Sequence, residues 1–328
     1  MILMPRCPAS IVRPVVSMAA ILILGRLPSA EAQLARAYAA AGGSDGNSCA
    51  SVNAPCRTLA GATAKAAAGG EVVVLDTGQY GGLTITKSVR IHAPAGVVAI
   101  VSKSISIKAA VGDNVVLRGL TLKANPPLSD LGIGGPATTG TAIELISGGT
   151  LHVESSVIDG WDIGIHVTAS TPSTCLAHVG NPSPECKVTI EDTTLRNCRV
   201  GLFSANDRTK ITIDESRFDH NTNGIVAPAG RVAVRGSVLD GSVVMGIQTD
   251  QAAEVNIDKC LIANNDEGIV VGLGWGGGTV RLSNSMVTGN GIGVSNHGPG
   301  GHFESFGNNA IRGNLSDIVG IVTSVALQ

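Results

Sequence analysis

The feature that most constrains this chain is a unit that repeats with a period in the low twenties of residues. Each unit holds three short apolar runs. The third apolar position of the first run serves as the reference position, or anchor, of the unit. These anchor positions are Val153, Ile190, Ile213, Val234, Ile257, Leu282 and Phe306. Another apolar residue follows every anchor by five positions, and a second follows by twelve or thirteen. A fixed period of this kind is the signature of a repeat architecture.

The repeat predicts an all-β solenoid. Each run is too short for a helix and alternates apolar with polar residues, as a half-buried strand does. Three such strands, separated by Gly, Asn and Asp turns, make one coil that cannot bury its apolar side alone, whereas stacked coils can. We therefore expect a parallel solenoid with three strands per coil and about nine or ten coils over residues 71–328.

Stacking places equivalent residues of successive coils in columns about 4.8 Å apart. One column holds small polar residues, and they are Ser156, Thr193, Ser216, Ser237, Cys260 and Ser285. Another holds Asn221, Asn265, Asn290 and Asn314, whose amides can bond to one another along the axis. Cys198 and Cys260 lie three coils apart, roughly 14 Å at this spacing, so we expect two separate interior thiols.

The N-terminal residues read as a secretory signal peptide over 1–32. Arg6 and Arg13 precede an apolar run at 15–24, and Ala30-Glu31-Ala32 matches a cleavage site. The alternative, a membrane anchor, is disfavoured because the run is about half the ~20 residues that a spanning helix needs. We therefore expect a secreted or periplasmic protein, cleaved after Ala32, with no membrane span in the mature chain.

Residues 33–70 are expected to form an N-terminal cap that covers the open end of the solenoid. An Ala-rich stretch at 60–68 follows Thr58, a candidate N-cap, and predicts a short helix. In an oxidising compartment Cys49 could pair with Cys56, and Cys175 with Cys186. The alternative for the second pair is a metal site with His178, but it lacks an evident fourth ligand.

Charge and composition exclude some classes of partner. The whole chain has a formal net charge of −2 and segment 1–32 carries +2, so the remainder carries −4. Nucleic-acid binding needs a dense basic surface, and we expect none here. No phosphate-binding glycine motif or metal-ligand cluster is evident, so no cofactor or metal is expected.

The units x-I-x-x-S-x-I-x-x-N-x-x-G-I, as in 210–225 and 254–269, resemble the right-handed parallel β-helix repeats of the pectin-lyase-like superfamily. The opening segment, 44–58 followed by 69–91, looks like the start of secreted bacterial β-helix proteins. The resemblance covers about residues 40–320 and implies the fold. The superfamily's lyases, galacturonases and epimerases have short catalytic signatures that this sequence lacks, so it implies no catalytic residue.

Two insertions break the period, at 125–140 and 168–186, and could wall a groove over the third strands. Strand alternation points Glu144 and His166 outward in adjacent coils. A carboxylate beside an imidazole can act as a general acid/base pair, although outward residues of a solenoid are usually just solvated. Phe203, Asp162 and Arg199 fall beside this pair as candidate substrate-binding residues.

A second candidate surface follows the second strands. Arg196, Arg217 and Asp219 are placed there with Asp159 and Asp240 at coil spacing. The arginines could hold a carboxylated sugar, or the alternating charges could form an exposed ion-pair ladder. His220, at the following turn, is a possible proton carrier.

Two functions remain open from the sequence. The favoured hypothesis is an exported, non-catalytic β-helix that presents a groove to polysaccharide or another cell-surface molecule. The alternative is a polysaccharide lyase, hydrolase or epimerase that uses the groove between the insertions. The oligomeric state leaves no signal in the sequence.

Overall fold

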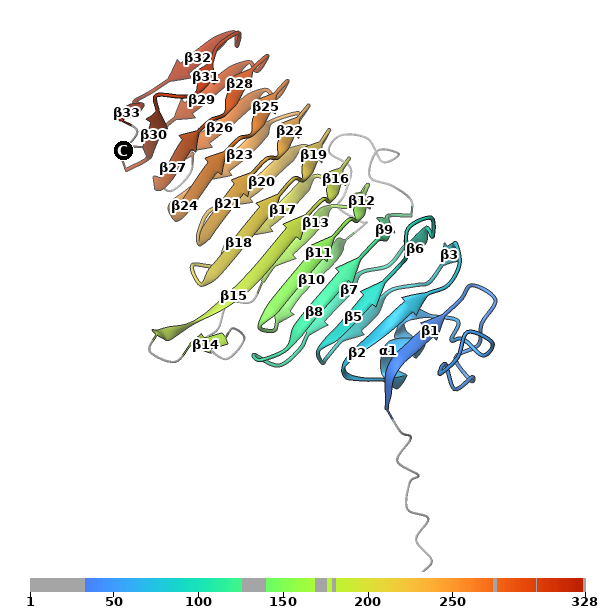
Figure 1. Cartoon of the computed structure of the whole chain (residues 1–328). Coiled ribbons are helices and arrows are strands. Elements are labelled where there is room, and N and C mark those ends of the chain that lie inside the picture. The colour runs from blue at the N-terminus through green and yellow to red at the C-terminus, as the bar shows by residue number, and fades with distance from the viewer. Residues whose placement is uncertain are drawn as a thin grey trace, which may run out of the picture. The chain divides into compact units, whose positions relative to one another are not determined.

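The computed structural model describes residues 33–125, 140–168, 176–178, 181–273, 276–298 and 300–326. They belong to one compact unit of the chain, Gln33–Gln328, in which parallel strands wind into successive coils (Figure 1). The predicted signal peptide, 1–32, lies outside the described residues.

Three parallel sheets run along the solenoid, and each complete coil gives one strand to each sheet. Sheet A consists of β1 (Leu34–Ala39), β2 (Ala66–Val74), β5 (Val89–His92), β8 (Asn114–Arg118), β11 (Thr150–Glu154), β15 (Asn181–Glu191), β18 (Thr209–Asp214), β21 (Arg231–Arg235), β24 (Gln251–Asp258), β27 (Gly277–Ser283), β30 (His302–Phe306) and β33 (Thr323–Val325), with β14 (Leu176–His178) antiparallel to β15. Sheet B consists of β3 (Gly78–Gln79), β6 (Ala99–Val101), β9 (Leu120–Lys123), β12 (Val157–Asp159), β16 (Thr194–Arg196), β19 (Arg217–Asp219), β22 (Val238–Asp240), β25 (Leu261–Ala263), β28 (Met286–Thr288) and β31 (Ala310–Ile311). Sheet C consists of β4 (Leu83–Ile85), β7 (Ile105–Lys108), β10 (Thr141–Ser147), β13 (Ile163–Val167), β17 (Val200–Ser204), β20 (Asn223–Ala227), β23 (Met245–Thr249), β26 (Glu267–Val271), β29 (Ile292–Asn296) and β32 (Ser316–Val319).

The strand register confirms the solenoid with three strands per coil. The anchor residues from Val153 to Leu282 pair directly, each with the next, along sheet A. Their side chains are at most 1% exposed and form one continuous interior row. The prediction of an anchor at Phe306 is wrong, because Leu282 pairs with Ser305. Phe303 is the buried aromatic residue of that strand.

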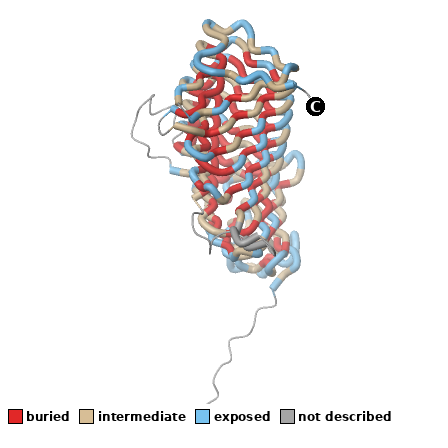
Figure 2. Tube along the Cα trace, turned by 90° about the vertical axis from the view of Figure 1, so that its left-hand side faces the viewer, coloured by how far each residue is buried: buried red, intermediate tan, exposed pale blue. Residues whose placement is uncertain are grey.

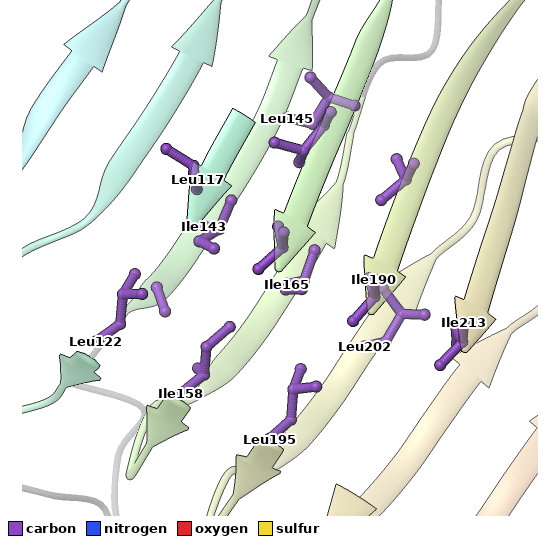
Figure 3. Packing of buried hydrophobic residues seen from close by; sticks show 14 of the residues in the cluster. Leu117, Leu122, Ile143, Leu145, Ile158, Ile165, Ile190, Leu195, Leu202 and Ile213 are labelled. Atoms are coloured by element: carbon purple, nitrogen blue, oxygen red, sulfur yellow. The ribbon is translucent and has the colours of Figure 1, made fainter. Parts of the chain in front are cut away.

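The interior is built from aliphatic side chains of all three sheets. The buried positions form continuous lines from coil to coil (Figure 2). In close view, Ile190 of sheet A, Leu195 of sheet B and Leu202 of sheet C belong to the same packed interior (Figure 3). Each coil therefore buries its apolar side against its neighbours, which is the source of stability expected for a stacked fold.

Both polar columns are observed, and they bond coil to coil. The backbone N–H of Thr193 donates to the Ser216 hydroxyl at 3.2 Å, and that of Ser216 donates to the Ser237 hydroxyl at 3.1 Å. In the asparagine column, Asn265 Nδ2 donates to Asn290 Oδ1 at 3.0 Å, and Asn290 Nδ2 donates to Asn314 Oδ1 at 2.8 Å. These side chains satisfy turn groups that would otherwise be buried without partners.

The N-terminal cap differs from the expectation in two ways. The helix α1 spans Leu59–Lys65, with Thr58 as its N-cap, and ends three residues before the predicted limit of Ala68. Ala66 instead begins β2, because β1 offers it a parallel partner at Leu34. The strand β1 itself was not predicted, since its inward residues Ala37 and Ala39 are small and give a weak alternation signal.

The cysteines behave largely as expected. Cys49 and Cys56 form a disulfide, with their Cα atoms 5.1 Å apart. Cys186 is disulfide-bonded as well; Cys175, its predicted partner, lies outside the described residues. A disulfide removes the Cys186 thiolate that the alternative metal site requires, so that alternative is wrong. Cys198 and Cys260 are free and buried, as predicted.

The two free thiols should resist modification in the folded protein. Burial raises the pKa of Cys198 to about 12 and that of Cys260 to about 11, so almost no thiolate exists at pH 8. We expect iodoacetamide to leave both unmodified under native conditions and to alkylate both in guanidinium, as read by peptide mass spectrometry. Rapid native alkylation of either would contradict the buried placement.

The asparagine column should contribute measurably to stability. Asn290→Ala removes the oxygen that accepts from both the backbone N–H and Nδ2 of Asn265. Leaving buried donors unpaired costs about 1–3 kcal/mol, which a urea titration can measure. Asn114→Ala is the matched control, since Asn114 is exposed and its side chain makes no hydrogen bond within the described ranges. Equal destabilisation by both variants would refute a role for the column.

Candidate functional site

The residues predicted as an acid/base pair lie side by side on the outer face of sheet C. Glu144 on β10 pairs in register with His166 on β13, which pairs with Phe203 on β17. Their inward neighbours, Ile143 and Ile165, are fully buried, so strand alternation turns all three candidate residues outward. The coil stack thus brings together a carboxylate, an imidazole and an aromatic ring from three successive coils.

The surroundings of His166 favour its neutral form. Partial burial lowers the pKa of the imidazole, and the negative charge of Glu144 opposes this shift without reversing it. The His166 ring meets the Phe203 ring edge to face, with centroids 5.2 Å apart and planes at 69°, a favoured aromatic geometry. Among the described residues no hydrogen bond or ion pair joins Glu144 to His166, so the imidazole is held by packing.

Asp162 and Arg199 lie at the turn that leads into sheet C, as predicted. The guanidinium of Arg199 makes two bonds to the carboxylate, one through Nε and one from Nη2 to Oδ2 at 3.1 Å. This pairing raises the pKa of Arg199. A ligand would therefore meet a neutralised pair at this border, able to offer the remaining donors of the guanidinium.

The predicted walls of the groove fall mostly outside the described residues. Residues 126–139 of the first insertion, and 169–175 and 179–180 of the second, belong to this part of the chain. One end of each insertion adjoins sheet C: the first enters β10 at Thr141, and the second leaves β13 after Val167. The remaining described part of the second insertion does not lie over sheet C, because it forms β14 and the start of β15, which pair antiparallel beside sheet A.

The second candidate surface, on sheet B, is a closed ladder of ion pairs. Arg196 bonds Asp159 at 3.1 Å, and Arg217 bonds both Asp219, at 3.2 Å, and Asp240, at 2.9 Å. Partial burial would raise the pKa of Asp219, but hydrogen bonds from Arg217 and His220 outweigh it and lower that pKa. Because these arginines already have carboxylate partners, little of their charge is left for a ligand. This arrangement agrees with the alternative of an exposed ion-pair ladder.

The sequence reasoning missed a hollow on the outer face of sheet A, near its N-terminal end. It is lined in part by Arg90, Arg118, His92, His152, Glu71 and Glu154. The sequence does contain a signal for this cluster. Its residues alternate along their strands with buried apolar residues, which indicates that they face outward; these buried residues are Val89, Ile91, Leu117 and Val153. The repeat is degenerate in this part of the chain, so the basic residues were not recognised as one cluster.

The described residues hold neither a metal site nor a membrane-spanning helix. No group of three or more His, Cys, Asp or Glu residues there is arranged to hold a metal ion. No helix in that part of the chain is long and apolar enough to cross a membrane.

Fold and site together define a parallel β-helix with buried polar columns at its turns and outward columns of mixed side chains on its faces. A family model described as "Right handed beta helix region" matches residues 141–315, just over half of the sequence. The chain therefore belongs to the right-handed β-helix family, and the predicted right-handed parallel β-helix repeats are confirmed.

The crystal structure of pectate lyase Pel9A is similar, with 16% identity and a TM-score of 0.46 over 84% of this chain and 70% of that one. A search of curated proteins finds no match.

The burial of His166 should make stability depend on pH. The unfolded chain protonates this imidazole near its ordinary pKa of about 6.5, whereas the folded chain protonates it at lower pH. Between the lowered pKa and about pH 6.5, the unfolded state therefore binds more protons than the folded state. The free energy of unfolding decreases as the pH falls through this range, and the decrease ends below the lowered pKa. We expect wild type to lose stability relative to His166→Gln between pH 7 and 5 in urea titrations.

The control for this comparison is His302→Gln, which removes an exposed histidine of sheet A. If the difference in free energy of unfolding between wild type and His166→Gln stays constant across this pH range, burial of the imidazole does not affect stability.

Proposed function

We propose that this protein is an exported β-helix that binds a polysaccharide along the outer face of sheet C, over Glu144, His166 and Phe203. The observation that carries the proposal is their register: three successive strands place the three side chains in one outward column. A polymer of sugar units presents a repeating surface, and a column of outward residues at strand spacing provides a matching one.

The chemistry of this column suits a sugar. Phe203 is partly exposed and offers an apolar face, while Glu144 can accept hydrogen bonds from hydroxyl groups. The neutral His166 imidazole has one donor and one acceptor. Carbohydrate sites commonly combine apolar contact with a few directed polar groups, as small-ligand sites do in general. Arg199, directly before β17, adds beside the same column the guanidinium donors that Asp162 leaves free.

Export is the second element of the proposal. The Cys49–Cys56 disulfide is compatible with an extracellular or periplasmic location, because such bonds persist in oxidising compartments. The basic and then apolar character of residues 1–32 agrees with it.

A second candidate function is a polysaccharide lyase, hydrolase or epimerase at the same column. The lowered pKa of His166 favours it, because a neutral imidazole near pH 7 is able to accept a proton from a substrate. Glu144, one coil away, would then supply the second group of the acid/base pair, a carboxyl or carboxylate. The absence of the superfamily's signatures from the sequence favours binding without catalysis.

The experiment measures binding to a panel of neutral and uronate polysaccharides with wild type and Phe203→Ala. Loss of the aromatic face should weaken binding about tenfold, the effect expected for roughly 1–2 kcal/mol of ring contact. Leu261→Ala is the matched control, since Leu261 is an exposed apolar residue on the outer face of sheet B, away from this column. Retention of every polysaccharide by Phe203→Ala as by wild type would overturn the proposal.

The same panel separates binding from catalysis. New reducing ends or unsaturated products that disappear in Glu144→Gln and His166→Ala would establish the enzyme. Binding without any product supports recognition alone.

A further inference from the structure

The two ends of the solenoid are built differently, and the N-terminal end is covered by its own chain. The backbone N–H of Tyr38 on β1 donates to the carbonyl of Cys49 at 2.9 Å, and the Tyr38 carbonyl accepts from the N–H of Cys56 at 2.8 Å. Arg57 donates to the carbonyl of Gln79 on β3 at 2.7 Å. The helix α1 contacts β4, the first strand of sheet C. The cap therefore contacts the first strand of every sheet.

At the C-terminal end, the interior row of sheet C opens to solvent. Its last five members pair in register from coil to coil, and they are Ile225, Ile247, Ile269, Val294 and Ile318. The first four are fully buried, but Ile318 on β32 is 44% exposed. None of the described residues after Phe303 is buried (Figure 2). The apolar interior thus ends at an open face.

The same end gathers exposed apolar side chains and open strand edges. Leu315 is 96% exposed and Ile321 is 78% exposed, and Val319 is exposed as well. The strands β31, β32 and β33 each end a sheet and have a partner on one side only among the described strands. Natural proteins commonly protect such edges with Lys or Pro, but residues 305–328 contain neither. Apolar surface and free backbone groups therefore coincide here, as they do in surfaces that bind another chain.

The charged side chains of this end are few and of both signs. Residues 305–328 contain one basic residue, Arg312, and one acidic residue, Asp317. The two pair with each other at 3.7 Å, and the Arg312 side chain is 88% exposed. A face with one charge of each sign is complementary to itself across a two-fold axis, because the arginine of one copy can meet the aspartate of the other. A second copy of this chain therefore meets no net repulsion there.

We propose that two copies of this chain associate end to end through their C-terminal coils. Contact between the exposed apolar residues of both copies, above all Leu315 and Ile321, removes their surface from water. The same contact covers the open interior at Ile318. A two-fold axis perpendicular to the solenoids sets one edge strand antiparallel to its own copy, so that free backbone groups can pair across the interface.

The difference between the two ends determines the symmetry of this dimer. A head-to-tail arrangement would join the open strand edges to the N-terminal end, where the cap is in the way, and its repetition would build a fibre. Joining like ends uses only the open face and closes after two copies. The association involves no residue of the proposed glycan column on sheet C, so either proposal can fail without the other.

Sedimentation velocity of the whole chain, from micromolar to near-millimolar concentration, tests the proposal. We expect a monomer–dimer equilibrium for wild type. The dimer should be at least about tenfold weaker for Ile321→Glu and for Leu315→Glu, because each change places a charge from both copies in the apolar contact. Val243→Glu is the matched control, since Val243 is an exposed valine between β22 and β23, and it should change the dimer affinity less than about twofold. Unchanged thermal unfolding of the variants at low concentration confirms that folded proteins are compared.

Spin labels identify the ends that meet. A label on Ser324→Cys marks the C-terminal coil, and one on Ala60→Cys marks an exposed position of α1. The free thiols Cys198 and Cys260 are buried and do not compete for the label. The twelve parallel strands of sheet A make the solenoid about 55 Å long at about 4.8 Å per strand. Pulsed EPR should therefore detect coupling between Ser324 labels and none between Ala60 labels, which lie about 110 Å apart in this dimer.

Four results would overturn the proposal. A wild-type monomer at every concentration would leave the open end to a different partner chain. A dimer that both glutamate variants leave intact, or one in which the Ala60 labels couple, would place the interface elsewhere on the molecule. Assemblies that keep growing with concentration would show head-to-tail stacking in place of a closed pair.

Discussion

The in-register pairing of each strand with its equivalent in the next coil is the constraint on which the rest of this structure depends. It aligns Ile190 with Ile213 and Ile213 with Val234, and so turns a sequence repeat into an aliphatic interior. It also aligns the hydroxyl and amide side chains at the turns, where they bond from coil to coil. The same alignment fixes which outward residues become neighbours, so the surface chemistry follows from the pairing as directly as the core does.

The outer faces differ in how far the stacking neutralises their charges. On sheet B, opposite charges fall in adjacent coils and pair, as Arg217 does with Asp219 and Asp240. On sheet C, Glu144, His166 and Phe203 succeed one another without ion pairing. On sheet A, Val116 interrupts a column of longer side chains and leaves a hollow. Candidate binding surfaces thus arise where a column changes its residue type.

Much of the fold could be predicted from the sequence because the repeat averages over many coils. Ser216 and Asn265 could be placed in their columns from spacing alone, since several equivalent residues supported each assignment. The prediction of the last anchor was wrong by one residue. Ser305 and Phe306 are adjacent in the last coil, and no further coil supports the choice between them. The strand β1 escaped prediction for the same reason, as its Ala-rich run has no equivalent elsewhere. That Glu144 and His166 are neighbours could be predicted from strand alternation. That Arg90 lacks an ion pair among the described residues could not, because Arg36, on the unpredicted strand β1, already bonds the adjacent Glu71.

The polar turn columns have a directional character along the molecule. In the bonds described, a backbone N–H of one coil donates to the side-chain oxygen of the coil that follows it in the chain, as Thr193 does to Ser216 and Asn265 to Asn290. Each coil therefore has its turn donors satisfied by its successor and supplies acceptors to its predecessor. A growing stack would gain these bonds when the next coil is added at its C-terminal end, so chain synthesis from the N-terminus and structural completion proceed in the same sense.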